Sequence, residues 1–164
     1  MKPYLYALEV HDMNVGKRYD MLPVHCTLVH WFELESAREQ EMQQRVQLIA
    51  SEIGTIALTA QSQETFSGMT KNGPIPVTVD TVVYTPELRA LHGGVCDILD
   101  DLGATYSNPP YVRETYVPHV THQTTGSLQT DSTHESTSLY LITADSAAYG
   151  NPRTVIDRVP LSKE

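Results

Sequence analysis

Two short patterns carry the side chains of this 164-residue chain that could perform acid-base chemistry. One is His25-Cys26-Thr27 and the other is His119-Val120-Thr121, which begins 119 − 25 = 94 positions later. Apolar and β-branched neighbours predict that both triplets lie on strands. Because side chains alternate across a strand, the histidine and the threonine of each triplet share one face. Each triplet is therefore predicted to present an imidazole beside a hydroxyl.

Two imidazoles that flank one phosphate could divide the work of cleaving a phosphodiester. One would take a proton from water or a ribose hydroxyl, and the other would protonate the leaving oxygen. Histidine titrates near neutral pH, and the threonine hydroxyls could donate hydrogen bonds to the non-bridging oxygens. The scheme needs no metal. A metal site built from the seven histidines is the weaker alternative, because His25 and His30 are predicted to lie on opposite faces of their strand.

Candidate substrate contacts lie outside the triplets. Lys71 and Arg113 occur in loop-like stretches and could bind phosphate, although a solvated surface charge is the alternative for Lys71. Tyr111, Tyr116 and Trp31 could stack on a nucleobase, and the alternative is that these rings pack in the core. The sequence has no Walker-type phosphate loop and no Gly-x-Ser-x-Gly elbow, which argues against nucleoside triphosphate hydrolysis and serine esterase chemistry.

The elements that must position the triplets follow from periodicity. Residues 3–10 and 24–32 are apolar on both faces, as in buried strands, and segments 56–60, extendable to 66, and 77–84 predict an antiparallel pair. Ser36 and Glu39 form a capping-box pattern, which predicts a helix that ends at Gly54. Thr85-Pro86 predicts the start of a second helix, which ends near Gly103. Short strands are predicted at 116–123, 138–143 and 154–159, with the polar segment 124–138 as an exposed loop.

This order of strands and helices predicts an α+β fold in which both helices cover antiparallel sheets. Residues 1–164 are expected to form a single domain. The Gly93-Gly94 pair inside the second helix costs helix stability, and a close approach of this helix to the sheet would explain it.

Composition limits the partners. Eleven basic against twenty acidic residues give a formal net charge of −9, which opposes binding of a long nucleic acid and favours a small nucleotide or short oligonucleotide. Cys26 and Cys96 lie in apolar segments and are expected to be buried thiols. The first residues lack a signal-peptide pattern and no apolar run is long enough to cross a bilayer. We expect a cytoplasmic monomer without a cofactor.

These features resemble the 2H phosphoesterase superfamily, which includes 2'-5' RNA ligase-like (LigT-like) cyclic phosphodiesterases and is defined by two His-x-(Ser/Thr) motifs. The resemblance rests on His25-Cys26-Thr27-Leu28 and Tyr116-Val117-Pro118-His119-Val120-Thr121, and it spans most of the chain. It implies a bilobal fold of two antiparallel β-rich halves, with helices packed outside and a central cleft. It also implies that the two histidines of the motifs are an acid/base pair and that the two threonines bind phosphate.

Two residues depart from the family pattern. His30 stands where many members have a small or apolar residue, and His122 replaces the common apolar residue after the second motif. By strand alternation both are predicted to lie on the face opposite the triplets, in structural or interfacial positions. The alternative is that they adapt the site to an unusual substrate.

The resemblance implies a metal-independent phosphodiesterase that acts on a small nucleotide. Members of the family act on 2',3'-cyclic phosphates of RNA, on 2'-5'-linked oligoadenylates and on cyclic nucleotide signals, and they include bacteriophage anti-defence proteins. One alternative is a non-catalytic protein that binds and sequesters a nucleotide, and another is RNA end processing or ligation.

Overall fold

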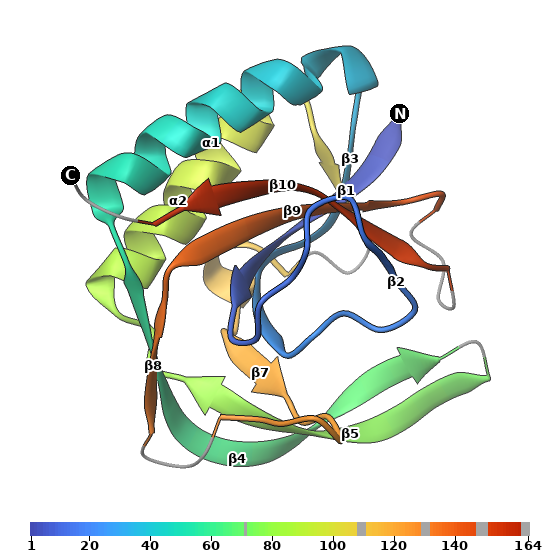
Figure 1. Cartoon of the computed structure of the whole chain (residues 1–164), viewed down its shortest axis with the longest axis vertical. Coiled ribbons are helices and arrows are strands. Elements are labelled where there is room, and N and C mark those ends of the chain that lie inside the picture. The colour runs from blue at the N-terminus through green and yellow to red at the C-terminus, as the bar shows by residue number, and fades with distance from the viewer. Residues whose placement is uncertain (71, 108–110, 129–131, 147–150, 162–164) are drawn as a thin grey trace.

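The computed structural model describes residues 1–70, 72–107, 111–128, 132–146 and 151–161. Within these ranges the chain forms ten strands, two α-helices and two short 3-10 helices (Figure 1). In chain order the elements are β1 (Lys2–Glu9), β2 (Arg18–Tyr19), β3 (His25–Leu34), η1 (Ser36–Arg38), α1 (Glu39–Ile53), β4 (Ile56–Thr70), β5 (Gly73–Val82), α2 (Pro86–Asp101), β6 (Thr105–Tyr106), η2 (Arg113–Thr115), β7 (His119–Thr121), β8 (Thr133–Ser136), β9 (Ser138–Ala144) and β10 (Arg153–Pro160).

The strands form one curled antiparallel sheet in the order β2-β10-β9-β1-β3-β7-β5-β4-β8, with β6 paired to β3. Figure 1 shows two groups of strands: β1, β3, β9 and β10 lie near the helices, and the long β4–β5 hairpin curls below them with β7 and β8. The groups meet where β3 pairs with β7. This arrangement confirms the predicted α+β fold of two antiparallel β-rich halves.

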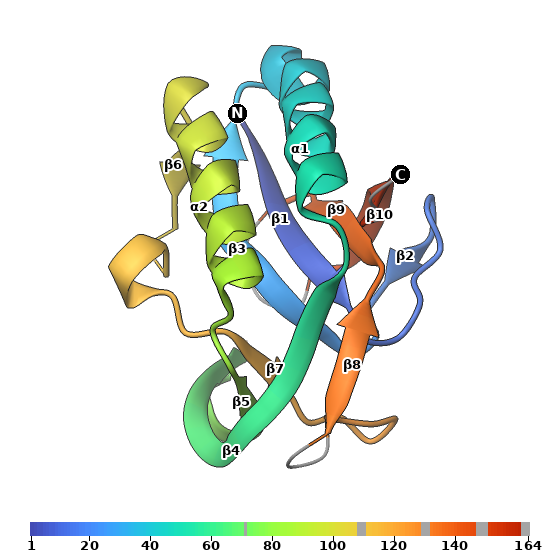
Figure 2. The ribbon, with the colours of Figure 1, turned by 90° about the vertical axis from the view of Figure 1, so that its left-hand side faces the viewer.

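Both helices pack against one face of the first group of strands. Figure 2 shows α1 and α2 side by side over β1 and β3. Their apolar stripes are buried, with Met42 and Val46 on α1 and Leu91 and Val95 on α2 packed in one core. A smaller core lies apart from this main one and takes in the segment between β1 and β3; its buried members are Leu5, Ala7, Met13, Leu22, Tyr140, Ile142 and Val155. Ala7 is the β1 partner of Thr27, so Thr27 of the first triplet lies on the side of this smaller core.

The two helices begin differently. Thr85 caps α2 as predicted, because its hydroxyl accepts a hydrogen bond from the Leu88 N–H at 3.1 Å. The predicted capping box of Ser36 and Glu39 is wrong: residues 36–38 form η1, and α1 begins at Glu39 without a side-chain cap. The Glu39 carboxylate instead accepts a hydrogen bond from the Tyr4 hydroxyl at 2.7 Å, which ties the start of α1 to β1.

Of the two adjacent glycines in α2, Gly94 faces the other helix and Gly93 faces open space. A Cβ built on Gly94 would lie 3.1 Å from Cδ1 of Ile49 on α1, whereas a Cβ on Gly93 would meet open space. The predicted approach of α2 to the sheet is therefore not the reason for the pair. Gly94 allows close helix packing, and no neighbouring atom requires a glycine at Gly93.

Two strands differ from their predicted lengths or positions. Strand β7 covers only His119–Thr121 of the predicted segment 116–123, and Pro118 directly before it has no N–H for a ladder. Strand β8 lies inside the segment 124–138 that was predicted to be an exposed loop. Its residues are polar and show no apolar alternation, so the sequence pattern does not predict a strand, but its backbone pairs with Ile56 to Thr59 of β4.

Candidate active site

The two His-x-Thr triplets lie side by side because their middle residues pair. Cys26 of β3 is the partner of Val120 of β7, and both side chains are fully buried in the core beneath the helices. The strands are antiparallel, so the residue numbers of each pair have the same sum, 26 + 120 = 146. Thr27 therefore lies opposite His119, and His25 lies opposite Thr121. All four polar side chains therefore point to the sheet face away from the helices.

Both imidazoles are held in the same orientation. Nδ1 of His25 lies 2.8 Å from the carbonyl oxygen of Pro23, and Nδ1 of His119 lies 2.8 Å from that of Val117. A carbonyl can only accept, so each Nδ1 carries the proton and donates it. The neutral form of each ring therefore offers the lone pair of Nε2. Each histidine uses the carbonyl two residues before it, so the geometry is repeated in the two triplets.

The environment favours the neutral form of both rings. Burial lowers the pKa of His25 from its ordinary value, the charges of His119 and Arg153 lower it further, and the hydrogen bond to Pro23 raises it. Burial also lowers the pKa of His119, against the effect of its bond to Val117. Arg153, at the start of β10, was not singled out from the sequence. Its Nη1 donates to the Asp20 carbonyl at 3.0 Å, and its charge acts on His25.

A buried network holds the segment before the second triplet against the first triplet. The hydroxyl of Tyr116 donates to the carbonyl of Thr27 at 2.8 Å, and its ring stacks on His92 of α2 with centroids 4.0 Å apart. His92 donates from Nδ1 to the carbonyl of Leu28 at 2.8 Å and accepts the Arg113 N–H at Nε2 at 2.9 Å. Tyr116 is buried, so its predicted role in stacking on a base is wrong. His92 was not singled out from the sequence; the feature that could have identified it is its position on the apolar face of α2.

His30 lies on the face of the triplets, which corrects the prediction from strand alternation. The pairing of β1 with β3 shifts twice: Tyr6 pairs with Val29 and Ala7 with Thr27, and between Tyr4 and Tyr6 two residues of β3 face one of β1. Each shift is a β-bulge, and a bulge changes the face to which later side chains point. The His30 ring consequently lies 6.2 Å from the His119 ring, centroid to centroid.

His122 lies on the other side of the sheet, as predicted. Its Nε2 is 2.8 Å from Oδ2 of Asp80, and Asp80 is the β5 partner of Val120. The carboxylate is buried, so the pair stabilises β7 from behind the triplets. His134 falls in the segment 124–138 that was predicted to be a loop, but it lies on β8, where its Nε2 is 3.2 Å from both carboxylate oxygens of Glu9.

The remaining predicted substrate contacts are dispersed. Lys71 lies outside the described residues. The Arg113 guanidinium lies at the surface but is already paired: its Nη2 lies 2.8 Å from Asp97 and 2.7 Å from Asp100, which does not support the predicted phosphate contact. Tyr111 is 47% exposed, and its ring lies 5.2 Å from that of His30.

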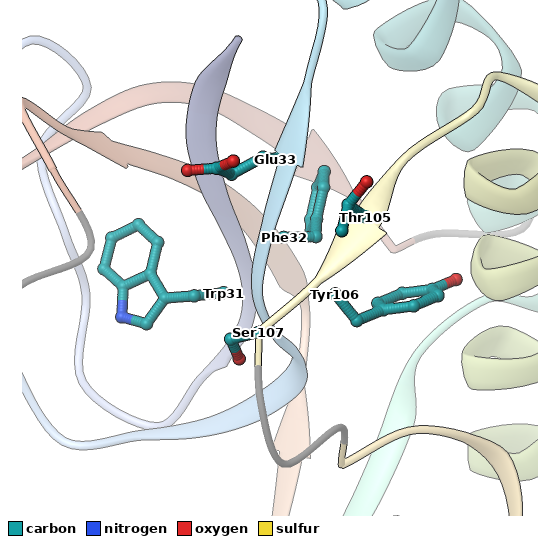
Figure 3. A pocket seen from close by; sticks show the side chains of 6 residues that line it. All are labelled: Trp31, Phe32, Glu33, Thr105, Tyr106 and Ser107. Atoms are coloured by element: carbon teal, nitrogen blue, oxygen red, sulfur yellow. The ribbon is translucent and has the colours of Figure 1, made fainter.

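Trp31 packs beside the smaller core, which does not support a base-stacking role. With Tyr106 and four further residues it lines a small cavity of about 150 Å³ where β6 pairs with β3 (Figure 3). None of the residues around this cavity belongs to the triplets. A second hollow, of about 340 Å³, lies on the β4–β5 hairpin and includes Phe66, whose ring is 5.0 Å from that of His119.

Other features of the described residues bear on the predicted chemistry. Cys26 and Cys96 are free and buried, as predicted, and burial raises the pKa of the Cys26 thiol to about 12. Among the described residues, no group of three or more His, Cys, Asp or Glu side chains is arranged to hold a metal ion. No helix in the described ranges is long and apolar enough to cross a membrane.

Comparison with solved structures identifies the fold. A structure described as a phosphoesterase has a TM-score of 0.59 at 15% identity, over 99% of each chain. The Thermus thermophilus protein TT0787 has a TM-score of 0.62 at 14% identity, again over 99% of each chain. LigT of E. coli in complex with 3'-AMP has a TM-score of 0.57 at 15% identity, with the same coverage.

The chain therefore shares the fold of these three structures along nearly its whole length, which confirms the fold that the sequence resemblance implied. No protein-family model and no curated protein matches the sequence.

Proposed function

We propose that this protein is a metal-independent phosphodiesterase of the two-histidine type that acts on a small nucleotide. The observation that carries the proposal is the common orientation of His25 and His119, each of which donates Nδ1–H to a carbonyl and keeps Nε2 on the face shared with Thr27 and Thr121. The fold supports it, because LigT structures of the same fold hold 3'-AMP, NADP+, ATP or phosphate.

In this proposal one Nε2 accepts a proton from the attacking water or ribose hydroxyl. The other histidine is protonated at Nε2 and gives that proton to the leaving oxygen, so one proton enters and one leaves the pair in each cleavage. The hydroxyls of Thr27 and Thr121 donate to the non-bridging oxygens, where charge accumulates in the transition state. A bound phosphate stabilises the protonated ring, which offsets the burial that lowers the pKa of both histidines.

The substrate we propose is short. A net charge of −9 disfavours a long polyanion, whereas one phosphodiester can be accommodated by local groups such as Arg153, whose charge acts on His25. The candidate substrates are 2',3'-cyclic phosphates, 2'-5' oligonucleotides and cyclic nucleotide signals, and an anti-defence role would follow from the last class.

The test is hydrolysis of a nucleotide panel in the presence of a chelator. The panel contains 2',3'-cyclic mononucleotides, 2'-5' and 3'-5' oligoadenylates and cyclic dinucleotides. His25→Ala and His119→Ala should each lower kcat by about 10²- to 10⁴-fold, the range expected for loss of a general acid or base. Arg113→Ala is the control, because its guanidinium pairs with Asp97 and Asp100, and it should retain the rate. Turnover that persists in both histidine variants would contradict the proposal.

A second function is favoured by one observation. The pKa values of both histidines are lowered, so the free protein holds two neutral rings near pH 7 and lacks a ready proton donor. Such a site would suit a protein that binds and sequesters a nucleotide. Tight nucleotide binding without turnover on any panel member, at any pH between 5 and 8, would support this alternative and exclude the enzyme.

A further inference from the structure

Four rings form a continuous row across the face of the triplets. Phe66 contacts His119 edge to face, with centroids 5.0 Å apart and an interplanar angle of 71°. His30 lies at 6.2 Å from His119 with nearly parallel planes, at 27°. Tyr111 lies beyond His30, at 5.2 Å and 51°. His119 is therefore enclosed between Phe66 and His30, and the row ends at Tyr111, which is 47% exposed.

The position of His30 depends on an irregularity of β3. Without the bulge between Thr27 and Val29, His30 would point into the core beneath the helices, because Leu28 and Val29 both lie in that core. The bulge places Leu28 and Val29 on the same side and sends the next residue to the face of His25. Bulges beside functional sites re-aim side chains, and here the re-aimed side chain is an aromatic ring.

From this row we infer that His30 and Tyr111 form a nucleobase-binding subsite next to His119. The inference rests on the proposed function, because it assumes a phosphate at the two triplets. In a nucleotide one sugar separates the base from the phosphate. The His30 ring is the neighbour of the His119 ring, so the surface formed by His30 and Tyr111 lies where the base of such a nucleotide would be placed.

The chemistry of the two rings suits stacking. Burial, together with the charges of His119 and His25, lowers the pKa of His30 to about 4. His30 is therefore a neutral ring near pH 7 and does not bind phosphate as a cation. Tyr111 adds an exposed aromatic face. Stacking of a base on an aromatic side chain contributes about 1–3 kcal/mol, which corresponds to roughly 5- to 150-fold in affinity.

Calorimetric titration can test the subsite with three probes: 3'-AMP, ribose 5-phosphate, which lacks a base, and inorganic phosphate. His30→Ala and Tyr111→Ala should each weaken 3'-AMP binding by roughly 5- to 150-fold and leave the binding of the other two probes unchanged. His30→Phe keeps a ring and should retain 3'-AMP binding within about threefold. Thermal unfolding of each variant checks that it is folded.

Three results would overturn the inference. The first is unchanged 3'-AMP binding in His30→Ala and Tyr111→Ala. The second is an equal loss for ribose 5-phosphate, which would mean that the rings only support the phosphate site. The third is a loss in His30→Phe as large as in His30→Ala. Failure of the proposed function is measured separately: the wild-type protein would then turn over no member of the nucleotide panel, whether or not it binds these probes.

Discussion

Cys26 and Val120 form the residue pair through which β3 meets β7, and each is the middle residue of a His-x-Thr triplet. Because both side chains are buried on the helix side, the flanking residues of both triplets must point to the other face. The pairing also crosses the triplets: each histidine lies opposite the threonine of the other strand. A site assembled in this way uses one imidazole and one hydroxyl from each half of the sheet.

Removing either threonine hydroxyl should slow the reaction. Thr27→Val and Thr121→Val keep the side-chain shape, and we expect kcat to fall by about 10²- to 10³-fold, the usual effect of losing one donor to a developing negative charge. Thr59→Val is the matched control, since the Thr59 hydroxyl is bonded to Thr133 on another part of the sheet. Steady-state rates on the best panel substrate measure the effect, and a Thr121→Val enzyme with full kcat would contradict it.

The rate should be highest at mildly acidic pH. Catalysis needs one protonated and one neutral histidine, and the pKa values of His25 and His119 both lie below the ordinary value of 6.5. In the free enzyme the fraction of molecules with exactly one protonated histidine therefore decreases as pH rises above these two pKa values. We expect kcat/KM to peak below pH 6.5 and then to fall about tenfold per pH unit. A profile from pH 4.5 to 8.5 tests this, and a maximum at pH 7.5 or above would refute it.

Tyr116 should act as a positioning residue. Tyr116→Phe removes the hydrogen bond to the Thr27 carbonyl, and we expect a loss of about 1 kcal/mol of unfolding free energy together with a lower kcat. Tyr106→Phe is the control, because it removes a hydroxyl that bonds Asp100. It should change stability and leave kcat unchanged. If both variants lose the same fraction of kcat, Tyr116 has only a structural role.

Alanine substitution at the two adjacent glycines of α2 should change the free energy of unfolding by different amounts. Gly93→Ala meets open space and should raise the free energy of unfolding by about 1 kcal/mol, the helix-propensity difference between the two residues. Gly94→Ala places a Cβ 3.1 Å from Ile49 Cδ1, so packing strain should cancel part or all of that gain. Urea unfolding of the two variants measures the difference, and equal stabilisation would show that the helices move apart without cost.

Much of the fold follows from local pattern. The apolar stripe and Thr85-Pro86 correctly placed α2, and Gly54 ends α1 with φ 86°, because caps and helical periodicity act within one or two turns. Strand alternation also correctly paired each histidine with its threonine on one face. These features depend on neighbours in the sequence, so the sequence by itself determined them.

Tertiary structure decided the rest. The pairing that brings His25 near Thr121 joins residues far apart in the sequence, and no short pattern encodes such a register. The same limit explains the errors. His30 was misplaced because bulges arise from how β1 and β3 pair, and the ion pairs of Arg113 were missed because Asp97 and Asp100 reach it from α2. The sequence determined which groups could act on a phosphate, and long-range backbone pairing decided which of them face one another.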